Sequence, residues 1–133
     1  MKSLKIISIL TFAFIISFGF SSCSSDDENS GSTPINRNVK YEITGDFTGK
    51  FLIVYSDENG AAQSVDGTLL PWTKEISLIT ANTASFSSQS TTAGMPGQTA
   101  TAKLIVNGET KRTETKTADE LGRIIFSNLN YTF

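Results

Sequence analysis

The feature that most constrains the fold of this chain is the alternation of apolar and polar residues after residue 38. In Val39–Gly45, the apolar side chains of Val39, Tyr41 and Ile43 point one way, and Lys, Glu and Thr point the other. No segment beyond residue 38 sustains the i, i+3, i+4 spacing of an amphipathic helix. The pattern predicts β-strands that bury one face, and hence an all-β domain.

About seven segments of this part are predicted to be strands separated by turns. The Asn107-Gly108 pair lies between two β-prone runs and predicts a tight hairpin. The strand that follows is polar on both faces, so we expect it at a sheet edge. A slip in the apolar phase between Phe126 and Leu129 predicts a β-bulge. The predicted strands are Val39–Gly45, Phe51–Tyr55, Trp72–Thr80, Thr83–Gln89, Ala100–Val106, Glu109–Thr117 and Arg123–Tyr131.

Short strands at intervals of about eight to twelve residues predict a small antiparallel β-sandwich of the immunoglobulin-like kind, spanning residues 39–133. Pro71 is expected at the start of a strand, because it cannot donate to a central ladder, with Trp72 entering the core. If Trp72 were instead exposed beside Tyr41 or Tyr55, the rings would offer a binding surface for a glycan. The loop Gly94–Gly97 is interpreted as a flexible tip.

Residues 1–22 are predicted to be a secretory signal peptide that is removed. A basic start precedes the uncharged run Ile6–Phe20, which is too short to cross about 30 Å of hydrocarbon as a helix. Cys23, the only cysteine of the chain, directly follows Ser21 and Ser22. The segment Phe20–Cys23 resembles a lipobox, although Phe stands where Leu is usual. The alternatives are an ordinary signal peptide with a chance cysteine, or an uncleaved anchor helix.

A lipid on Cys23 would anchor the mature protein, because two or three acyl chains hold a protein on a membrane whereas one chain does so weakly. Residues 23–38 would then be the anchor and a flexible polar tether. The acidic stretch within it resembles the export signal of surface-exposed Bacteroidota lipoproteins. We expect an outer membrane lipoprotein exposed on the cell surface, with the periplasmic face as the alternative. The stretch consists of Ser25, Asp26, Asp27 and Glu28.

The composition argues against catalysis and against nucleic-acid binding. The chain of 133 residues contains no His, which removes the commonest general base and metal ligand. Eleven basic and 13 acidic residues give a net charge of −2, which provides no basic field for nucleic acid. Asp57, Glu58 and Asp66 lack calcium-loop spacing and are interpreted as turn residues. Lys74 and Lys103, which a Ser–Lys pair would need, are interpreted as solvent-facing. We expect no enzyme activity, cofactor or metal.

Four motifs of the predicted domain resemble the MmpS family. They are Val39–Gly45, Ile53–Asp57 with Gly60, Leu70–Trp72 and Leu104–Gly108. The resemblance implies a small β-sandwich outside the inner membrane, and the best-known members assist large resistance-nodulation-division transporters that export lipids or siderophores. This chain departs from mycobacterial members, which keep an uncleaved transmembrane helix and commonly carry a cysteine pair in the last third.

The sequence therefore predicts a lipid-anchored, non-enzymatic β-sandwich that binds an envelope protein or another envelope ligand, and no nucleic acid. Two alternatives stay open. The family resemblance implies an accessory subunit of an envelope transport system. A surface adhesion or glycan-binding module would instead use Trp72, Tyr41 and Tyr55.

Overall fold

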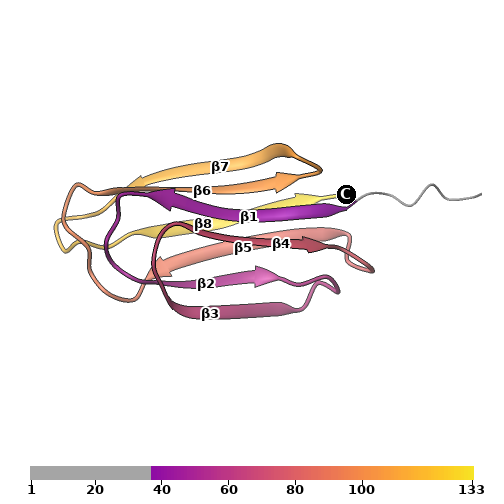
Figure 1. Cartoon of the computed structure of the whole chain (residues 1–133), viewed down its shortest axis with the longest axis horizontal. Helices are drawn as coiled ribbons and strands as arrows, with labels where there is room; N and C mark the ends of the chain where they lie inside the picture. The colour runs from indigo at the N-terminus through magenta and orange to yellow at the C-terminus, as the bar shows by residue number, and fades with distance from the viewer. Residues whose placement is uncertain (1–36) are drawn as a thin grey trace, which may run out of the picture. The chain divides into compact units, whose positions relative to one another are not determined.

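The computed structural model describes residues 37–133, and the regular structure in this part consists of β-strands (Figure 1). Their order along the chain follows the predicted sequence of strands and turns, with one strand added. The strands are β1 Asn38–Gly45, β2 Phe51–Ser56, β3 Ala62–Thr68, β4 Trp72–Ser77, β5 Thr83–Ser90, β6 Thr99–Val106, β7 Glu109–Thr117 and β8 Ile125–Thr132.

The strands form two four-stranded antiparallel sheets. Sheet A has the order β4-β1-β6-β7, and sheet B has the order β3-β2-β5-β8. Their inner faces enclose one hydrophobic core, so the predicted all-β sandwich is confirmed. The added strand is β3, which is exposed along nearly its whole length and therefore lacks the alternation by which strands are recognised.

Alternating side chains from both sheets form the core. Val39, Tyr41 and Ile43 of β1 are at most 2% exposed, and they face Ile53 and Phe86 of sheet B. The ring centroids of Tyr41 and Phe86 lie 5.5 Å apart, which joins the two sheets through an aromatic pair. The remaining buried apolar residues are Phe47, Phe51, Tyr55, Leu78, Ala84, Ala100, Ala102, Leu104, Val106, Ala118, Ile124, Phe126 and Leu129.

The hairpin predicted at Asn107-Gly108 is confirmed. Val106 pairs with Glu109 across a two-residue turn, and the turn residues have φ angles of 52° and 83°. A type I′ turn requires positive φ at both positions, which Asn and Gly tolerate best. β7 lies at the edge of sheet A, as expected from its charged sequence, and its Lys, Arg and Glu side chains discourage pairing with another chain.

The bulge predicted between Phe126 and Leu129 is also confirmed. Phe86 pairs with Leu129 and Ser88 pairs with Phe126, so β8 contains one extra residue between these pairs. In a regular strand, residues three apart point to opposite faces. The extra residue lets Phe126 and Leu129 both point into the core, where they are 3% and 5% exposed.

β4 begins at Trp72, directly after the cis peptide bond between Leu70 and Pro71, so Pro71 precedes the strand as expected. The strand ends at Ser77 and not at Thr80. Beyond it, the amide of Leu78 donates to the carbonyl of Arg37, at an N–O distance of 3.0 Å, and the Leu78 side chain is buried. The backbone leaves the ladder with β1 at Ile79, whose amide donates to the carbonyl of Glu58 at 2.8 Å.

The chain joins the sandwich at the end that carries the Asn107-Gly108 turn and the C-terminal Phe133 (Figure 1). Arg37 donates a 2.9 Å hydrogen bond to the side-chain oxygen of Asn82, and its guanidinium carbon lies 5.7 Å from the centre of the Phe133 ring. Asn38 already pairs with Ser77 in sheet A. Both residues, which the sequence assigned to the tether, are therefore fixed to the domain.

Candidate functional site

The three aromatic residues of the alternative glycan-binding surface lie together, but Tyr41 and Tyr55 are in the core and Trp72 packs against it. The ring centroids of Tyr41 and Tyr55 are 5.6 Å apart, and those of Tyr55 and Trp72 are 6.0 Å apart. Tyr41 is fully buried, and Tyr55 is 9% exposed. Two of the three rings therefore offer no open face for stacking a ligand. The alternation of β1 explains the burial of Tyr41, because its side chain points to the same inner face as those of Val39 and Ile43.

Trp72 is half-buried at the start of β4 and packs on the core. Its ring lies nearly parallel to that of Phe86, with centroids 6.0 Å apart and an angle of 19°. It also pairs in register with Ile43 of β1. Aromatic pairs of this kind stabilise a protein by about 0.5–1.5 kcal/mol beyond burial. The packing favours a core anchor over a ligand-stacking side chain.

The hydroxyl of Tyr41 links sheet A to sheet B. It donates to the carbonyl of Ser56 at 2.9 Å and lies 2.9 Å from the hydroxyl of the same residue. That serine hydroxyl accepts a 3.0 Å hydrogen bond from the amide of Ser85. Burial raises the pKa of Tyr41 above its usual value, so the hydroxyl stays protonated and continues to donate. The network serves the packing of the two sheets.

Charged side chains cover the outer face of sheet A, which is turned away from the core. The ammonium of Lys40 lies 3.0 Å from one carboxylate oxygen of Glu42, and that of Lys103 lies 3.6 Å from the other. The hydrogen bond from Lys40 holds the pKa of Glu42 below its usual value. Pairs in contact with water contribute only about 0–1 kcal/mol to stability, so their main effect is to keep this face hydrated.

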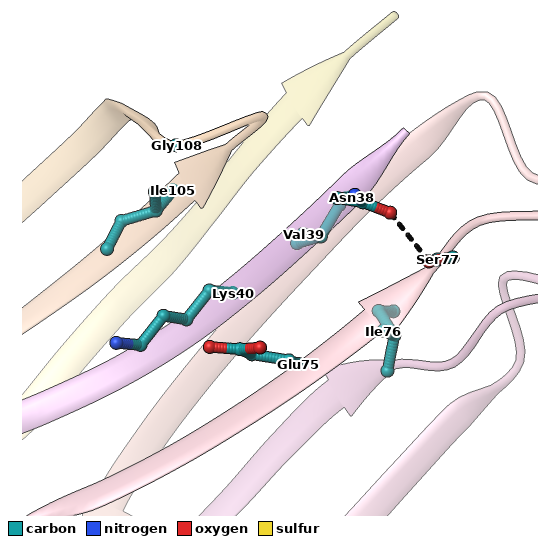
Figure 2. Close-up of a pocket in the computed structure, with 8 residues that line it drawn as sticks. All are labelled: Asn38, Val39, Lys40, Glu75, Ile76, Ser77, Ile105 and Gly108. Atoms are coloured by element: carbon teal, nitrogen blue, oxygen red, sulfur yellow. Dashed lines mark hydrogen bonds between the residues drawn. The ribbon is translucent and has the colours of Figure 1, made fainter. Parts of the chain in front are cut away.

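A shallow hollow of about 430 Å³ lies over the same sheet near the start of β1 (Figure 2). Lys40 and Glu75 pair in register across β1 and β4, and Ile105 of β6 lies on the other side of the hollow. The hydroxyl of Ser77 donates to the side-chain oxygen of Asn38 at 2.6 Å. Its lining is mixed: Asn38, Lys40, Glu75 and Ser77 are polar or charged, and Val39, Ile76 and Ile105 are apolar, so the lining does not favour a polar ligand over an apolar one.

The outer face of sheet B carries apolar and uncharged polar side chains. Leu52 and Val54 of β2 are half-buried, and Ile125 of β8 is 66% exposed. Together with Ser87 and Gln89 of β5 they line a second shallow hollow, of about 270 Å³. Phe51–Tyr55 is a continuous apolar run, so its sequence does not show which side chains face outward. Leu52 and Val54 lie on the outer face.

The acidic residues considered for calcium serve a turn. One carboxylate oxygen of Asp57 accepts hydrogen bonds from the amides of Asn59 and Ala61, at 3.0 and 2.9 Å. The other accepts one from the side chain of Gln63, at 2.9 Å, and these bonds hold the pKa of Asp57 below its usual value. Within residues 37–133, no three His, Cys, Asp or Glu residues are grouped as metal ligands would be.

The two lysines considered for a Ser–Lys pair have other neighbours. Lys103 contacts Glu42, as described above. The ammonium of Lys74 lies 6.0 Å from the centre of the Tyr55 ring, a geometry in which a cation is attracted to an aromatic face. Lys103 lies on the outer face as interpreted, whereas Lys74 is exposed but pairs in register with the inward-facing Tyr41.

Gln98 ties together the loops at the end of the sandwich opposite Asn38. Its side-chain oxygen accepts hydrogen bonds from the amides of Met95 and Thr48, at 2.8 and 3.1 Å. Its side-chain nitrogen donates to the carbonyl of Asp46 at 2.8 Å. The loop Gly94–Gly97, expected to be a flexible tip, is thus fixed to the loop between β1 and β2. Nothing in the sequence marks Gln98, because most of its partners are distant along the chain.

The predicted lipidation site and export signal lie outside the described residues. These are Cys23 and the stretch formed by Ser25, Asp26, Asp27 and Glu28, and they stay predictions. In the part of the chain that the structure describes, no helix is long and apolar enough to cross a membrane.

Comparison with known families adds an independent observation to this geometry. The family model described as Mycobacterium membrane protein matches residues 6–122, from the start of the apolar run Ile6–Phe20 to beyond the end of β7. A comparison with curated proteins finds no match. Because the family match covers well over half of the chain, the resemblance drawn from the four motifs is confirmed: the chain belongs to the family of Mycobacterium membrane proteins, the MmpS family.

Proposed function

We propose that this chain is a lipid-anchored accessory protein of the cell envelope, whose β-sandwich binds another protein and catalyses no reaction. Family membership carries the proposal, because it indicates a membrane-associated accessory protein of the envelope. The match begins at residue 6, so it takes in the apolar amino-terminal run as well as the domain.

The carboxyl groups of the domain with clearly shifted pKa values are suited to structural roles and not to general acid catalysis. Each carboxyl group with a clearly shifted pKa in residues 37–133 is shifted downward. Hydrogen bonds from Lys40 and from the amide of Thr99 are the main causes at Glu42 and Asp46. Such groups remain ionised at neutral pH, whereas a general acid needs a pKa near the working pH. Glu42 belongs to the hydrated face of sheet A, Asp46, Asp57 and Asp119 belong to loops and turns, and Glu114 accepts hydrogen bonds from Ser127 where β7 meets β8.

The anchor that we propose is a lipid on Cys23, in place of the transmembrane helix of mycobacterial members. The position of the only cysteine, directly after a short apolar run and two serines, supports it. The acidic stretch Ser25–Glu28 supports surface display in the manner of a Bacteroidota outer membrane lipoprotein. The domain would then lie outside the cell at the end of its tether.

The anchor is tested on the full chain expressed in its own cells, by mass spectrometry of the mature amino terminus. We expect a chain that begins at Cys23 and carries the mass of the acyl groups. Cys23→Ala should retain residues 1–22, because the lipid-dependent peptidase no longer cuts, whereas the neighbouring Ser24→Ala should be processed normally. A parent chain without acyl mass would contradict the anchor.

Surface display is tested by adding protease to intact cells. The parent should be degraded, and a variant with Asp26→Asn, Asp27→Asn and Glu28→Gln should be protected, because the acidic signal is lost. Protection of the parent as well would place the domain on the periplasmic face.

Within this function, family membership favours an accessory subunit of a transport system over a glycan-binding module. The glycan alternative depended on exposed rings, and Tyr41 and Tyr55 are buried. Photo-crosslinking from the outer face of sheet A in intact cells, at Ile105 for example, should capture a transport protein. Capture of polysaccharide alone would reverse this preference.

A further inference from the structure

The two sheets differ sharply in charge. Each strand of sheet A contains Lys, Arg or Glu. β2, β5 and β8 of sheet B contain no charged residue, and β3 contains Asp66 alone. An outer face of a soluble domain that faces only water is normally rich in charge, because charged groups hydrate well and keep chains apart. The composition of sheet B is that of a face with a partner.

The strand register places the apolar side chains of this face in one continuous area. Leu52 lies opposite Gln89, and Gln89 lies opposite Ile125, so that one row crosses β2, β5 and β8. Val54 lies opposite Ser87 in the next row. We call this area the uncharged face; its residues are Leu52, Val54, Ser85, Ser87, Gln89 and Ile125.

We propose that two copies of this chain pair through their uncharged faces, around a two-fold axis. A two-fold axis brings each residue near the same residues of the other copy, so a charged face would repel itself. Hydroxyl and amide groups can each donate and accept, so Ser87 and Gln89 can bond to their own equivalents. Leu52, Val54 and Ile125 would lose contact with water at the same time.

The outer face of sheet A does not meet these conditions. Its ion pairs among Lys40, Glu42 and Lys103 would lose water on pairing. Removing such charges from water costs more than their mutual attraction returns unless the geometry is ideal. The difference in charge therefore assigns the second copy to sheet B and leaves sheet A to water or to a charged partner.

The size of the uncharged face sets the strength of the pair. The three strands that carry this face, about 4.8 Å apart and about 20 Å long, present about 300 Å², well under half of what a standard interface buries on each partner. A pair of this size is weak in dilute solution. Confinement of both copies to one membrane raises their effective concentration, and in this respect the inference rests on the proposed lipid anchor.

The pairing is tested by cysteine cross-linking of the full chain in intact cells. Val54→Cys, Ser87→Cys and Gln89→Cys place a thiol on the uncharged face in three separate chains. Thr101→Cys is the matched control, because Thr101 is likewise half-buried on the outer face of a central strand, but in sheet A. Mild oxidation should join copies into a reducible dimer from one or more positions on sheet B and not from Thr101.

A second substitution tests whether the face itself makes the contact. In the chain that cross-links best, Leu52→Lys should reduce the dimer about tenfold or more, because it buries an unpaired charge. Ile105→Lys, at a half-buried position on the outer face of sheet A, should leave the dimer unchanged. An equal loss in both chains would contradict a contact through sheet B.

Two results would overturn the pairing. One is a level of dimer at all three positions no higher than at Thr101. The other is a cross-link from these positions to a different protein in place of a second copy. The parent chain tests the lipid anchor independently of the pairing, because its only thiol is that of Cys23. A dimer already formed by the parent would mean that this sulfur carries no lipid, and the scan would then be repeated with Cys23→Ala.

Discussion

The outer faces of the two sheets present opposite surfaces to their surroundings, although their inner faces share one core. On sheet A, Lys40 and Lys103 hold Glu42 between them. On sheet B, Leu52 and Ile125 occupy corresponding outward positions among serine and amide groups. Inward positions are set by the need to bury apolar area, which applies equally to both sheets. Outward positions are free of that need, so they carry the information about partners.

The largest effects on stability are expected from substitutions in the hydrophobic core that the two sheets share. Ile53 of sheet B and Leu104 of sheet A are both fully buried. Ile53→Ala and Leu104→Ala should each lower the free energy of unfolding by about 2–5 kcal/mol, because each leaves a cavity in the same core. Urea unfolding measures both, with the outward-facing Leu52→Ala as control. A large loss for only one of the two would mean that the sheets pack independently.

An intermediate effect is expected where the sheets are joined by hydrogen bonds. Tyr41→Phe removes the hydroxyl that donates to Ser56 and leaves a buried carbonyl without this partner. The free energy of unfolding should fall by about 1–3 kcal/mol. Tyr131→Phe, at a half-buried position near the end of β8, should cost less in the same thermal or urea measurement. Equal costs would mean that the Tyr41 bond is no special link between the sheets.

The smallest effect should distinguish the outer faces. Since the pKa of Glu42 is lowered in the folded state, its charged form stabilises the protein above the unfolded pKa, and this contribution is lost as the pH falls through the folded pKa. Glu42→Gln should therefore cost less than about 1 kcal/mol at pH 7 and nothing well below about pH 4.

The matching substitution on sheet B is Gln89→Ala, measured by urea unfolding at several pH values and salt concentrations. Its effect should depend on neither, because β2, β5 and β8 contain no Asp, Glu, Lys or Arg. A pH dependence equal to that of Glu42→Gln would remove the distinction between the two faces.

Local chemistry explains which parts of the fold could be predicted. The Asn107-Gly108 turn depends on φ angles that few residues adopt, and the bulge in β8 follows from the spacing of Phe126 and Leu129. Both signals are contained within a few residues. β3 carries no such signal, because an edge strand with both faces exposed to water shows no alternation of apolar and polar residues.

The candidate surfaces were harder to predict than the fold. The alternation in β1 already placed Tyr41 with the core residues Val39 and Ile43, so its burial follows from the pattern more directly than a role in binding. The bonds of Gln98 depend on loops that only the folded chain brings together. Likewise, the contrast between the outer faces requires the strand order, because the strands of sheets A and B are interleaved along the chain.

The position of β1 has a mechanical consequence. The strand lies inside sheet A, between β4 and β6, and the preceding residues leave from its Asn38 end. Antiparallel ladders bond perpendicular to their strands, so a pull along β1 loads many hydrogen bonds at once instead of opening them one by one. Arg37, bonded to Asn82, adds one contact to the domain just before this strand. A force applied through the residues before β1 would therefore act on the ladders of a central strand in shear.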